Sequence, residues 1–372
     1  MAIILDTRDP DRVVYCLDGQ GNTLWTYEAG AMQPFPTVAD LDQDGLDEVI
    51  IAGAKLVVLQ HDGTVRWQAE LPLTASAVAG NLIGDAAPEI VAVAGNGQVT
   101  AFSGDGQELF RSQTGPRCQI PVLTDLDGDG MLEIVVAGEK GVAAFSGQGR
   151  LLWQSALAGE PMYAPAVADL DQDGKEEVIN FCRTDYQGFL QTFSSGGKLL
   201  WQAVVSREPD WSPIVVAMEA DQRPCIIAQD VDPRRLAIWD GQGHLLRYLA
   251  TTGRALQTPV ALDMNSDRRP DLLLACDLSY RVWALANDAT PLWSYTPKSL
   301  TLPGAKIKGG GSLLVADLDG DSLFEIVGGD DETWLNLIRT DLPCRPWQIH
   351  SGQYHGDSRH SGNYLKPEAT AP

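Results

Sequence analysis

Residues 123–138, LTDLDGDGMLEIVVAG, decide the fold because the same phrase recurs along the chain. Close copies are VADLDQDGLDEVIIAG at 38–53, VADLDQDGKEEVINFC at 167–182 and VADLDGDSLFEIVGG at 315–329. Three more divergent copies bring the total to seven. The Asp-rich loop of each copy begins at residue 40, 81, 125, 169, 217, 263 or 317, which is a mean spacing near 46 residues. A regular period of this size predicts a solenoid or a propeller in place of conventional domains.

A second phrase, such as VAAFSGQGRLLW at 142–153, runs in step with the first. Two short apolar runs separated by a turn rich in Gly, Asp or Asn indicate a β-hairpin. The hairpin occurs eight times, and its second strand carries an anchor residue, usually aromatic, at Trp25, Trp67, Phe110, Trp153, Trp201, Arg247, Trp293 and Trp347.

Each period therefore predicts four strands, one on each side of the Asp-rich loop and two in the hairpin. The strand after the loop is almost wholly apolar, as in EIVVAG, so both of its faces must be covered. Radial closure of the sheets covers those faces and leaves only short edges. The sequence thus predicts an all-β fold, a single β-propeller of four-stranded blades.

Blade number and closure follow from the two ends of the chain. Seven loops accompany eight hairpins because the N-terminal 34 residues supply strands two to four of a blade without strand one. If the C-terminal tail donates that strand, the ring has eight blades, which we favour; otherwise it has seven. We therefore expect residues 1–350 to form the propeller, closed by N- and C-terminal strands, and residues 351–372 to dock on the ring.

The Asp-rich loops are the candidate metal sites. In the four close copies, carboxylates occupy loop positions 1, 3, 5 and 9, namely Asp40, Asp42, Asp44 and Glu48; Asp125, Asp127, Asp129 and Glu133; Asp169, Asp171, Asp173 and Glu177; and Asp317, Asp319, Asp321 and Glu325. Clustered carboxylates repel one another without a cation. Oxygen ligands of this kind suit Ca²⁺, whose shell takes about six to eight oxygens, better than Zn²⁺. The alternative is a set of metal-free Asx-turns.

The divergent loops differ in how many ligand positions they keep. The loop at 263 keeps Asp263, Asn265, Asp267 and Asp271 but has Arg268 at position 6, and we count it as a fifth Ca²⁺ site. The loop at 81 has Ile83 at position 3, and the loop at 217 keeps only Glu219 and Asp221, so both are expected to be metal-free.

These D-x-D-x-D-G-x-x-E loops, each followed by an apolar strand, resemble the FG-GAP/VCBS repeat family. That family includes the calcium-bearing propeller of integrin α subunits and many bacterial surface and secreted proteins. The resemblance covers about residues 1–350 and implies a propeller whose loop carboxylates bind Ca²⁺ and whose face loops hold ligands. Blade-entry segments such as FPTVAD and YAPAVAD stand where the family has its FG-GAP tripeptides.

Composition excludes several classes of protein. The 372 residues include 27 basic and 50 acidic ones, and the net charge of −23 argues against nucleic-acid binding. No apolar run approaches the roughly 18 residues of a membrane span, so membrane insertion is not expected.

The first residues, MAIILDTRDPDR, do not read as a signal peptide. Weak extracellular-type calcium sites nevertheless favour an exported or cell-surface protein, whereas six scattered cysteines point the other way. The sequence leaves the oligomeric state open.

Two segments could bind a ligand. The inserted segment TPKSLTLPGAKIKGGG holds Lys298, Lys306 and Lys308, and the segment SREPDWSP holds Trp211, whose ring could stack on a sugar. A solvated connector and a packing aromatic are the respective alternatives. His350, His355 and His360 share the tail, where packing roles are commoner than metal ligation.

Three function classes compete. The leading hypothesis is a non-catalytic, calcium-stabilised binding or adhesion scaffold whose ligand is a glycan or a protein. The second is a polysaccharide lyase acting on uronate glycans, for which the three lysines are the concentrated source of positive charge. The third is a quinoprotein dehydrogenase, which the Trp-bearing eightfold repeat resembles. No H-E-x-x-H, G-x-S-x-G or Walker motif occurs in the sequence.

Overall fold

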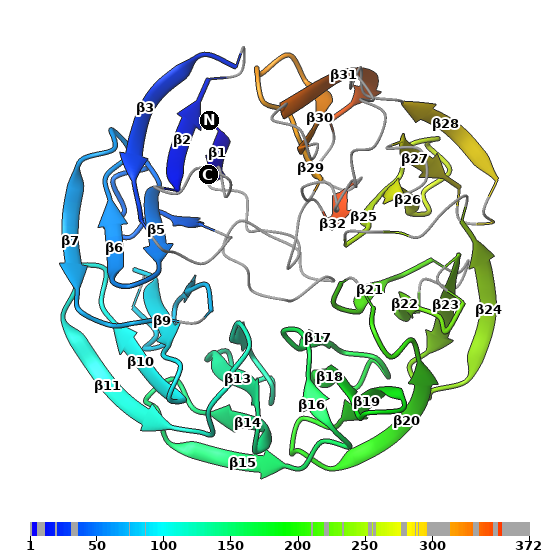
Figure 1. The fold of residues 1–372 in the computed structure, drawn as a ribbon, viewed down its shortest axis with the longest axis horizontal. Helices are drawn as coiled ribbons and strands as arrows, with labels where there is room; N and C mark the ends of the chain where they lie inside the picture. The colour runs from blue at the N-terminus through cyan, green and yellow to red at the C-terminus, as the bar shows by residue number, and fades with distance from the viewer. Residues whose placement is uncertain are drawn as a thin grey trace.

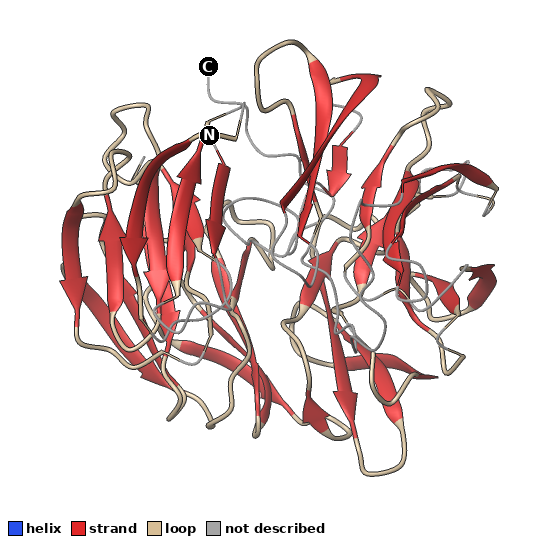
Figure 2. Cartoon of the chain, turned by 45° about the horizontal axis from the view of Figure 1, so that its top comes forward, coloured by secondary structure: helices blue, strands red, loops and turns tan. Residues whose placement is uncertain are grey.

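The computed structural model describes residues 2–5, 12–18, 21–30, 36–73, 75–85, 87–209, 211–218, 223–232, 234–251, 255, 258–276, 281–286, 288, 290–295, 313–329, 335–344 and 349–351. These residues form antiparallel sheets that follow one another in chain order around a ring (Figure 1). Within them every regular element is a strand, and no helix suited to crossing a membrane is found (Figure 2). The predicted all-β propeller is confirmed.

The strands group into eight sheets within the described residues. The first contains β1 (Ala2–Leu5), β2 (Val13–Leu17) and β3 (Thr23–Glu28). The second contains β4 (Thr37–Ala39), β5 (Glu48–Ala52), β6 (Leu56–Leu59) and β7 (Val65–Ala69). The third contains β8 (Val78–Gly80), β9 (Glu89–Val93), β10 (Gln98–Phe102) and β11 (Glu108–Gln113). The fourth contains β12 (Val122–Thr124), β13 (Glu133–Gly138), β14 (Gly141–Phe145) and β15 (Leu151–Ser155).

The second half of the ring continues the pattern. The fifth sheet contains β16 (Glu160–Pro161), β17 (Ala166–Ala168), β18 (Glu177–Arg183), β19 (Gly188–Phe193) and β20 (Leu199–Val205). The sixth contains β21 (Ile214–Val216), β22 (Cys225–Gln229), β23 (Arg235–Asp240) and β24 (Leu245–Ala250). The seventh contains β25 (Val260–Leu262), β26 (Asp271–Cys276), β27 (Arg281–Leu285), β28 (Pro291–Tyr295) and the tail strand β32 (Ile349–Ser351). The eighth contains β29 (Leu314–Ala316), β30 (Leu323–Gly329) and β31 (Leu335–Pro343).

The strand after each Asp-rich loop is the core of its sheet. β5, β9, β13 and β22 are buried at every position, whereas the outer strands β7, β11 and β15 alternate between exposed and half-buried residues. Burial of consecutive residues means that both faces of the strand are covered, as the apolar runs predicted. Each sheet therefore depends on its neighbours for a large part of its apolar burial.

The first and seventh sheets show how the two ends of the chain are arranged. The first sheet has three strands and lacks an inner strand among the described residues, as the sequence predicted. The tail strand β32 pairs with β25, through Ala261 with Ser351 and Leu262 with Ile349. This pairing places the tail on the inner edge of the seventh sheet. Residues 352–372 lie outside the described part, and closure of the ring by the tail stays a prediction.

In the first five sheets, the anchor aromatic contacts the hairpin turn of the next sheet. The Nε1–H groups of the indoles donate to turn carbonyls 36–42 residues downstream: Trp25 to His61 O at 2.9 Å, Trp67 to Gly104 O at 2.9 Å, Trp153 to Ser195 O at 2.7 Å and Trp201 to Gly241 O at 2.9 Å. Phe110 occupies the same place above Gly149. The repeated aromatic is thus an intersheet contact that exists only once neighbouring repeats have folded.

The turn glycines are required by these rings. Gly197 has φ +82°, a left-handed conformation that favours glycine, and a Cβ there would lie 2.6 Å from the ring carbons of Trp153. Glycine at this position therefore serves both the turn and the close approach of the indole.

We expect Gly197→Ala to destabilise the protein by about 2–4 kcal/mol, combining left-handed strain with a steric clash. Gly174→Ala is the matched control, because Gly174 has φ +88° but a Cβ added there would meet no atom within 4 Å. That control is expected to cost about 1 kcal/mol. Denaturant midpoints measured in chelator check both values, and equal losses would contradict a specific indole–glycine contact.

Candidate metal centre

Three carboxylates converge in each of the four close-copy loops. Their ligand oxygens lie within 4.8 Å of one another in four clusters: Asp40, Asp42 and Glu48; Asp125, Asp127 and Glu133; Asp169, Asp171 and Glu177; and Asp317, Asp319 and Glu325. The three residues occupy loop positions 1, 3 and 9. The loop thus brings together groups that would repel one another in the absence of a cation or a proton.

The position-9 carboxylate is buried and fixed by the loop backbone. One oxygen accepts the N–H of position 2, from Leu41 to Glu48 at 2.9 Å, from Leu126 to Glu133 at 3.0 Å and from Leu170 to Glu177 at 2.9 Å. Leu318 and Glu325 repeat the bond at 2.8 Å. The second oxygen remains available to the cluster.

Burial disfavours the charged form of these glutamates. Desolvation, with a smaller contribution from the neighbouring aspartates, raises the pKa of Glu133 and of Glu177 to about 7. Desolvation also raises the pKa of Glu48. A bound cation would offset this cost by favouring the ionised form.

The loop backbone takes the same left-handed turns in all five candidate loops. Positions 4 and 6 have positive φ even where they are not glycine, as at Gln43 (63°), Gln172 (64°), Ser266 (63°), Arg268 (66°) and Ser322 (67°). Side chains rarely adopt this conformation, and each instance costs on the order of 1 kcal/mol. The N–H groups exposed by the turn donate to position 1, for example Asp44 and Gly45 to Asp40 at 3.1 and 3.0 Å.

The position-5 aspartates are placed differently from the other predicted ligands. Each uses one oxygen to accept the N–H of position 7 at 2.8 Å, from Leu46 to Asp44, Met131 to Asp129, Lys175 to Asp173 and Leu323 to Asp321. They are absent from the four clusters of the described residues. Their part in metal binding stays a prediction, and their Asx-turn role is what the structure provides.

The loop at 263 repeats backbone hydrogen bonds of the four cluster loops. Met264 N–H donates to Asp271 at 2.8 Å, and Asp267 N–H donates to Asp263 at 3.2 Å and to Asn265 Oδ1 at 2.9 Å. Burial raises the pKa of Asp271 to about 6. Arg268 takes the left-handed position 6 despite its side chain, so this loop remains a candidate for a fifth cation.

The loop at 81 differs from the four clusters at position 3. In the loop at 81, Glu89 keeps its bond from Leu82 N–H at 2.7 Å, but Ile83 replaces the position-3 carboxylate and is exposed. Glu219 and Asp221 lie outside the described residues. The position-9 bond therefore belongs to the loop fold itself, and position 3 distinguishes the carboxylate clusters.

The Asp-rich loops lie against the hairpin turn of the following sheet. A Cβ on Gly104 would lie 2.4 Å from Leu41 O, one on Gly147 would lie 2.3 Å from Leu82 O, and one on Gly241 would lie 2.6 Å from Leu170 O. The same turns receive the anchor aromatics. Each of these loops is therefore part of a junction between two sheets, where a cation would stabilise more than the loop alone.

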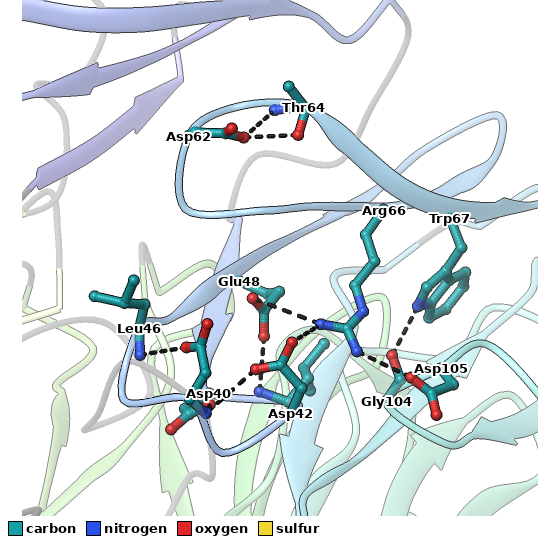
Figure 3. Close-up of polar contacts among 12 residues, drawn as sticks. Asp40, Asp42, Leu46, Glu48, Asp62, Thr64, Arg66, Trp67, Gly104 and Asp105 are labelled. Atoms are coloured by element: carbon teal, nitrogen blue, oxygen red, sulfur yellow. Dashed lines mark hydrogen bonds and ion pairs between the residues drawn. The ribbon is translucent and has the colours of Figure 1, made fainter.

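Arginines contact two of the clusters. Arg66 of β7 is hydrogen-bonded to Asp42, and its Nη1 lies 3.9 Å from Glu48 Oε1 (Figure 3). Arg339 of β31 lies 3.2 Å from Asp319. Neither residue was predicted from the sequence. The sequence did contain a signal for Arg66. The neighbouring hairpins have leucine immediately before the anchor aromatic, where this hairpin has arginine.

The proposed ligand-binding residues are not brought together in the described residues. Trp211 is 2% exposed and packs in a core cluster with Ile214 and Trp239, which favours its packing role. Lys298, Lys306 and Lys308 lie outside the described residues, as do His355 and His360. Four of the six cysteines are free and buried, and Cys344 is half-buried.

Two family models match parts of the chain. One is the FG-GAP-like repeat, over residues 125–179, and this span contains two of the carboxylate clusters. Residues 125–179 are therefore similar to an FG-GAP-like repeat. The other is described as the outer membrane protein assembly factor BamB and matches residues 3–114. Both are β-propeller repeat families, so the FG-GAP-like loops and the Trp-bearing hairpins are two features of one ring.

Solved structures share the propeller architecture at low sequence identity. The biofilm matrix protein Bap1 of V. cholerae has a TM-score of 0.68 and 15% identity, with 98% of this chain and 89% of that chain covered. The dihydro-heme d1 dehydrogenase NirN has a TM-score of 0.56 and 14% identity, covering 96% and 76%. BBS1N in complex with ARL6DN has a TM-score of 0.54 and 13% identity, covering 83% and 92%. A search of curated proteins found no match. Likeness at this identity shows the fold alone.

The raised pKa values predict that the metal-free protein loses stability as the pH rises. Glu133 and Glu177 have higher pKa values folded than unfolded, so the folded state binds more protons between the unfolded value near 4.5 and the folded value of about 7. Their stabilising contribution is complete below pH 4.5 and is lost as the pH passes 7. We expect a loss on the order of 1–3 kcal/mol between pH 5 and pH 8 in chelator.

The double variant Glu133→Gln with Glu177→Gln is the control for this pH dependence. Glutamine can still accept the N–H of Leu126 or Leu170 but does not titrate. Melting curves at several pH values in chelator should therefore show a flatter pH dependence for the variant. The same slope in both proteins would assign the effect to other groups.

Proposed function

We propose that the protein is a non-catalytic, calcium-stabilised β-propeller scaffold that binds a glycan or a protein. The observation that carries the proposal is the fourfold repetition of one cluster, in which carboxylate oxygens of positions 1, 3 and 9 lie within 4.8 Å of one another. A single acidic loop is common without an ion. Four repeats of the same three-carboxylate cluster support a shared ligand.

The donor set favours calcium over other divalent ions. The clusters offer carboxylate oxygens and no nitrogen or sulfur among the described residues, which suits a hard cation. Three or more formal negative charges around one point suit Ca²⁺, whose flexible shell also accepts carbonyl oxygens and water. The buried second oxygen of Glu48, which has no hydrogen-bond partner in the described part of the chain, supports a cation at that point.

The position of the loops supports a structural role for the cation. The loops at 40 and 169 contact the turn that also receives the anchor indole, so neutralising their charge would strengthen intersheet junctions. A propeller held by such junctions would present rigid face loops to a ligand. Bound cations would thus act on binding indirectly, through the scaffold.

We expect calcium to raise the melting temperature substantially, because it binds folded loops and not the unfolded chain. A site filled at 100 times its dissociation constant contributes about 2.7 kcal/mol. Asp127→Ala should lower the calcium stoichiometry by one and reduce the stabilisation. Asp85→Ala, in the loop that lacks a position-3 carboxylate, should change neither.

Calorimetric titration and thermal melts, each with and without chelator, measure these quantities. A melting temperature that chelation leaves unchanged would refute a structural cation. Equal effects of Asp127→Ala and Asp85→Ala would refute the assignment of the cation to the repeated cluster.

Two observations support the binding role: the propeller architecture and the descriptions of similar proteins. Bap1 is described as a biofilm matrix protein and BamB as an outer membrane protein assembly factor, roles that involve association with other molecules. No observation among the described residues favours the lyase alternative, because the lysines on which it depends lie outside them.

We expect a screen of immobilised glycans and candidate proteins to detect binding in calcium that weakens in chelator. On a panel of uronate polymers we expect no turnover, measured as the ultraviolet absorbance of an unsaturated product. Replacing Lys298, Lys306 and Lys308 together with alanine should leave calcium binding intact and alter at most the affinity for an acidic ligand. Turnover that this triple variant abolishes would establish the lyase in place of the scaffold.

A further inference from the structure

We infer that Arg66 is a built-in counter-cation of loop 40–48 that a divalent cation must displace, so that this loop binds divalent cations more weakly than loops 125–133 and 169–177. The inference rests on the proposed function, since it concerns the affinity of one of the proposed sites. It assigns to Arg66 a role in determining which loops are filled first.

The guanidinium of Arg66 lies against two carboxylates of the cluster. Its Nη1 donates to Asp42 Oδ2 and lies 3.9 Å from Glu48 Oε1, and its Nη2 donates to Asp105 Oδ1 at 2.9 Å (Figure 3). The side chain is only 14% exposed. The positive charge is therefore held in place by two sheets and is partly shielded from water, where its interactions are stronger than at the surface.

The atoms that Arg66 faces are those that a metal would use. Asp42 and Glu48 are two of the three members of the cluster, and Glu48 is completely buried. Glu48 Oε1 accepts no hydrogen bond from the described residues, even with Arg66 nearby. Arg66 thus compensates the charge of the cluster only in part, and a divalent cation bound there would have to move the guanidinium away.

Arg66 stands at a position where the repeats with loops 125–133 and 169–177 have an apolar residue. It precedes the anchor Trp67, and the equivalent residues beside loops 125–133 and 169–177 are Leu152 before Trp153 and Leu200 before Trp201. Both leucines are exposed. Leucine offers no charge to either cluster, so the equivalent of Arg66 is missing at this position of those two repeats.

A second departure accompanies the first. Asp105 lies in the turn of the next sheet, where the turns that follow the other two loops carry Gly196 and Gln242. The acidic residue therefore occurs at the junction that has the arginine. Asp105 already accepts a hydrogen bond from Arg66 Nη2, so the guanidinium would keep this partner when a cation takes Asp42.

Arg339 makes a similar but weaker contact with loop 317–325. It lies 3.2 Å from Asp319, but its side chain is 61% exposed. Exposed ion pairs are screened by water and contribute little. We therefore place the inferred effect on Arg66 alone.

The test replaces Arg66 by leucine in one variant and Leu152 by arginine in another, and measures calcium binding to each. Arg66→Leu should raise the affinity of one calcium site on the order of tenfold, the effect typical of residues that contact metal ligands. In calorimetric titration the number of tight sites should increase by one. Leu152→Arg, on an exposed position, should have the reverse effect and remove one tight site. The double variant Asp42→Ala with Arg66→Leu should lose the site that Arg66→Leu gained.

Stability without metal provides a second measurement. In chelator, Arg66→Leu should lower the melting temperature, because three carboxylates are left without a counter-charge, and calcium should restore it. Arg111→Leu is the matched control, since Arg111 lies on the neighbouring outer strand and pairs with Glu108, which belongs to none of the clusters. It should change neither calcium affinity nor the response to chelator.

The outcomes distinguish the inference from the proposed function. If Asp127→Ala removes a calcium site while Arg66→Leu and Leu152→Arg leave all affinities unchanged, the role of Arg66 is overturned and the proposed scaffold stands. If the wild-type protein binds no calcium, the proposed function falls and the role of Arg66 falls with it. A gain of one tight site in Arg66→Leu, together with a loss in Leu152→Arg, supports the inference.

Discussion

The contact on which the structure depends is that between the face of one sheet and the face of the next. The second strand of a repeat is buried on both sides, so an isolated sheet would expose much of its apolar surface to water. The anchor indole fixes the neighbouring sheet by a hydrogen bond to a turn carbonyl and by direct contact with a glycine that has no side chain to obstruct it. The Asp-rich loops at 40 and 169 lie at this repeated junction.

The Asp-rich loops lie at that junction and bring negative charge to it. Their position-9 carboxylate is buried to hold the loop backbone, and the same bond is made in the loop at 81, which lacks the cluster. The loop fold therefore does not require a metal, whereas the convergence of three carboxylates does require compensation. The protein has more than one way to supply it: a proton on the buried glutamate, a cation, or, at loop 40–48, a guanidinium.

The repeats are consequently not equivalent, although the sequence pattern makes them look alike. Loops 125–133 and 169–177 combine full clusters with apolar neighbours, and loop 40–48 shares its cluster with Arg66. The loop at 263 keeps the backbone hydrogen bonds but has an amide in place of one carboxylate. The acidic clusters of one ring therefore differ in the charge that surrounds them, and on the proposed function they would differ in metal affinity.

The sequence by itself determined the all-β repeat, the position of the loops and which of them carry carboxylates, because these features are local and recur with a fixed period. It also identified the anchors Trp67 and Trp153 as repeated positions. Only the tertiary structure decided what these residues contact, since an indole and its carbonyl partner belong to different repeats about 40 residues apart. The partners of Arg66 and the pairing of β32 with β25 were decided in the same way. Such contacts depend on how neighbouring sheets meet, and no spacing within a single repeat encodes that geometry.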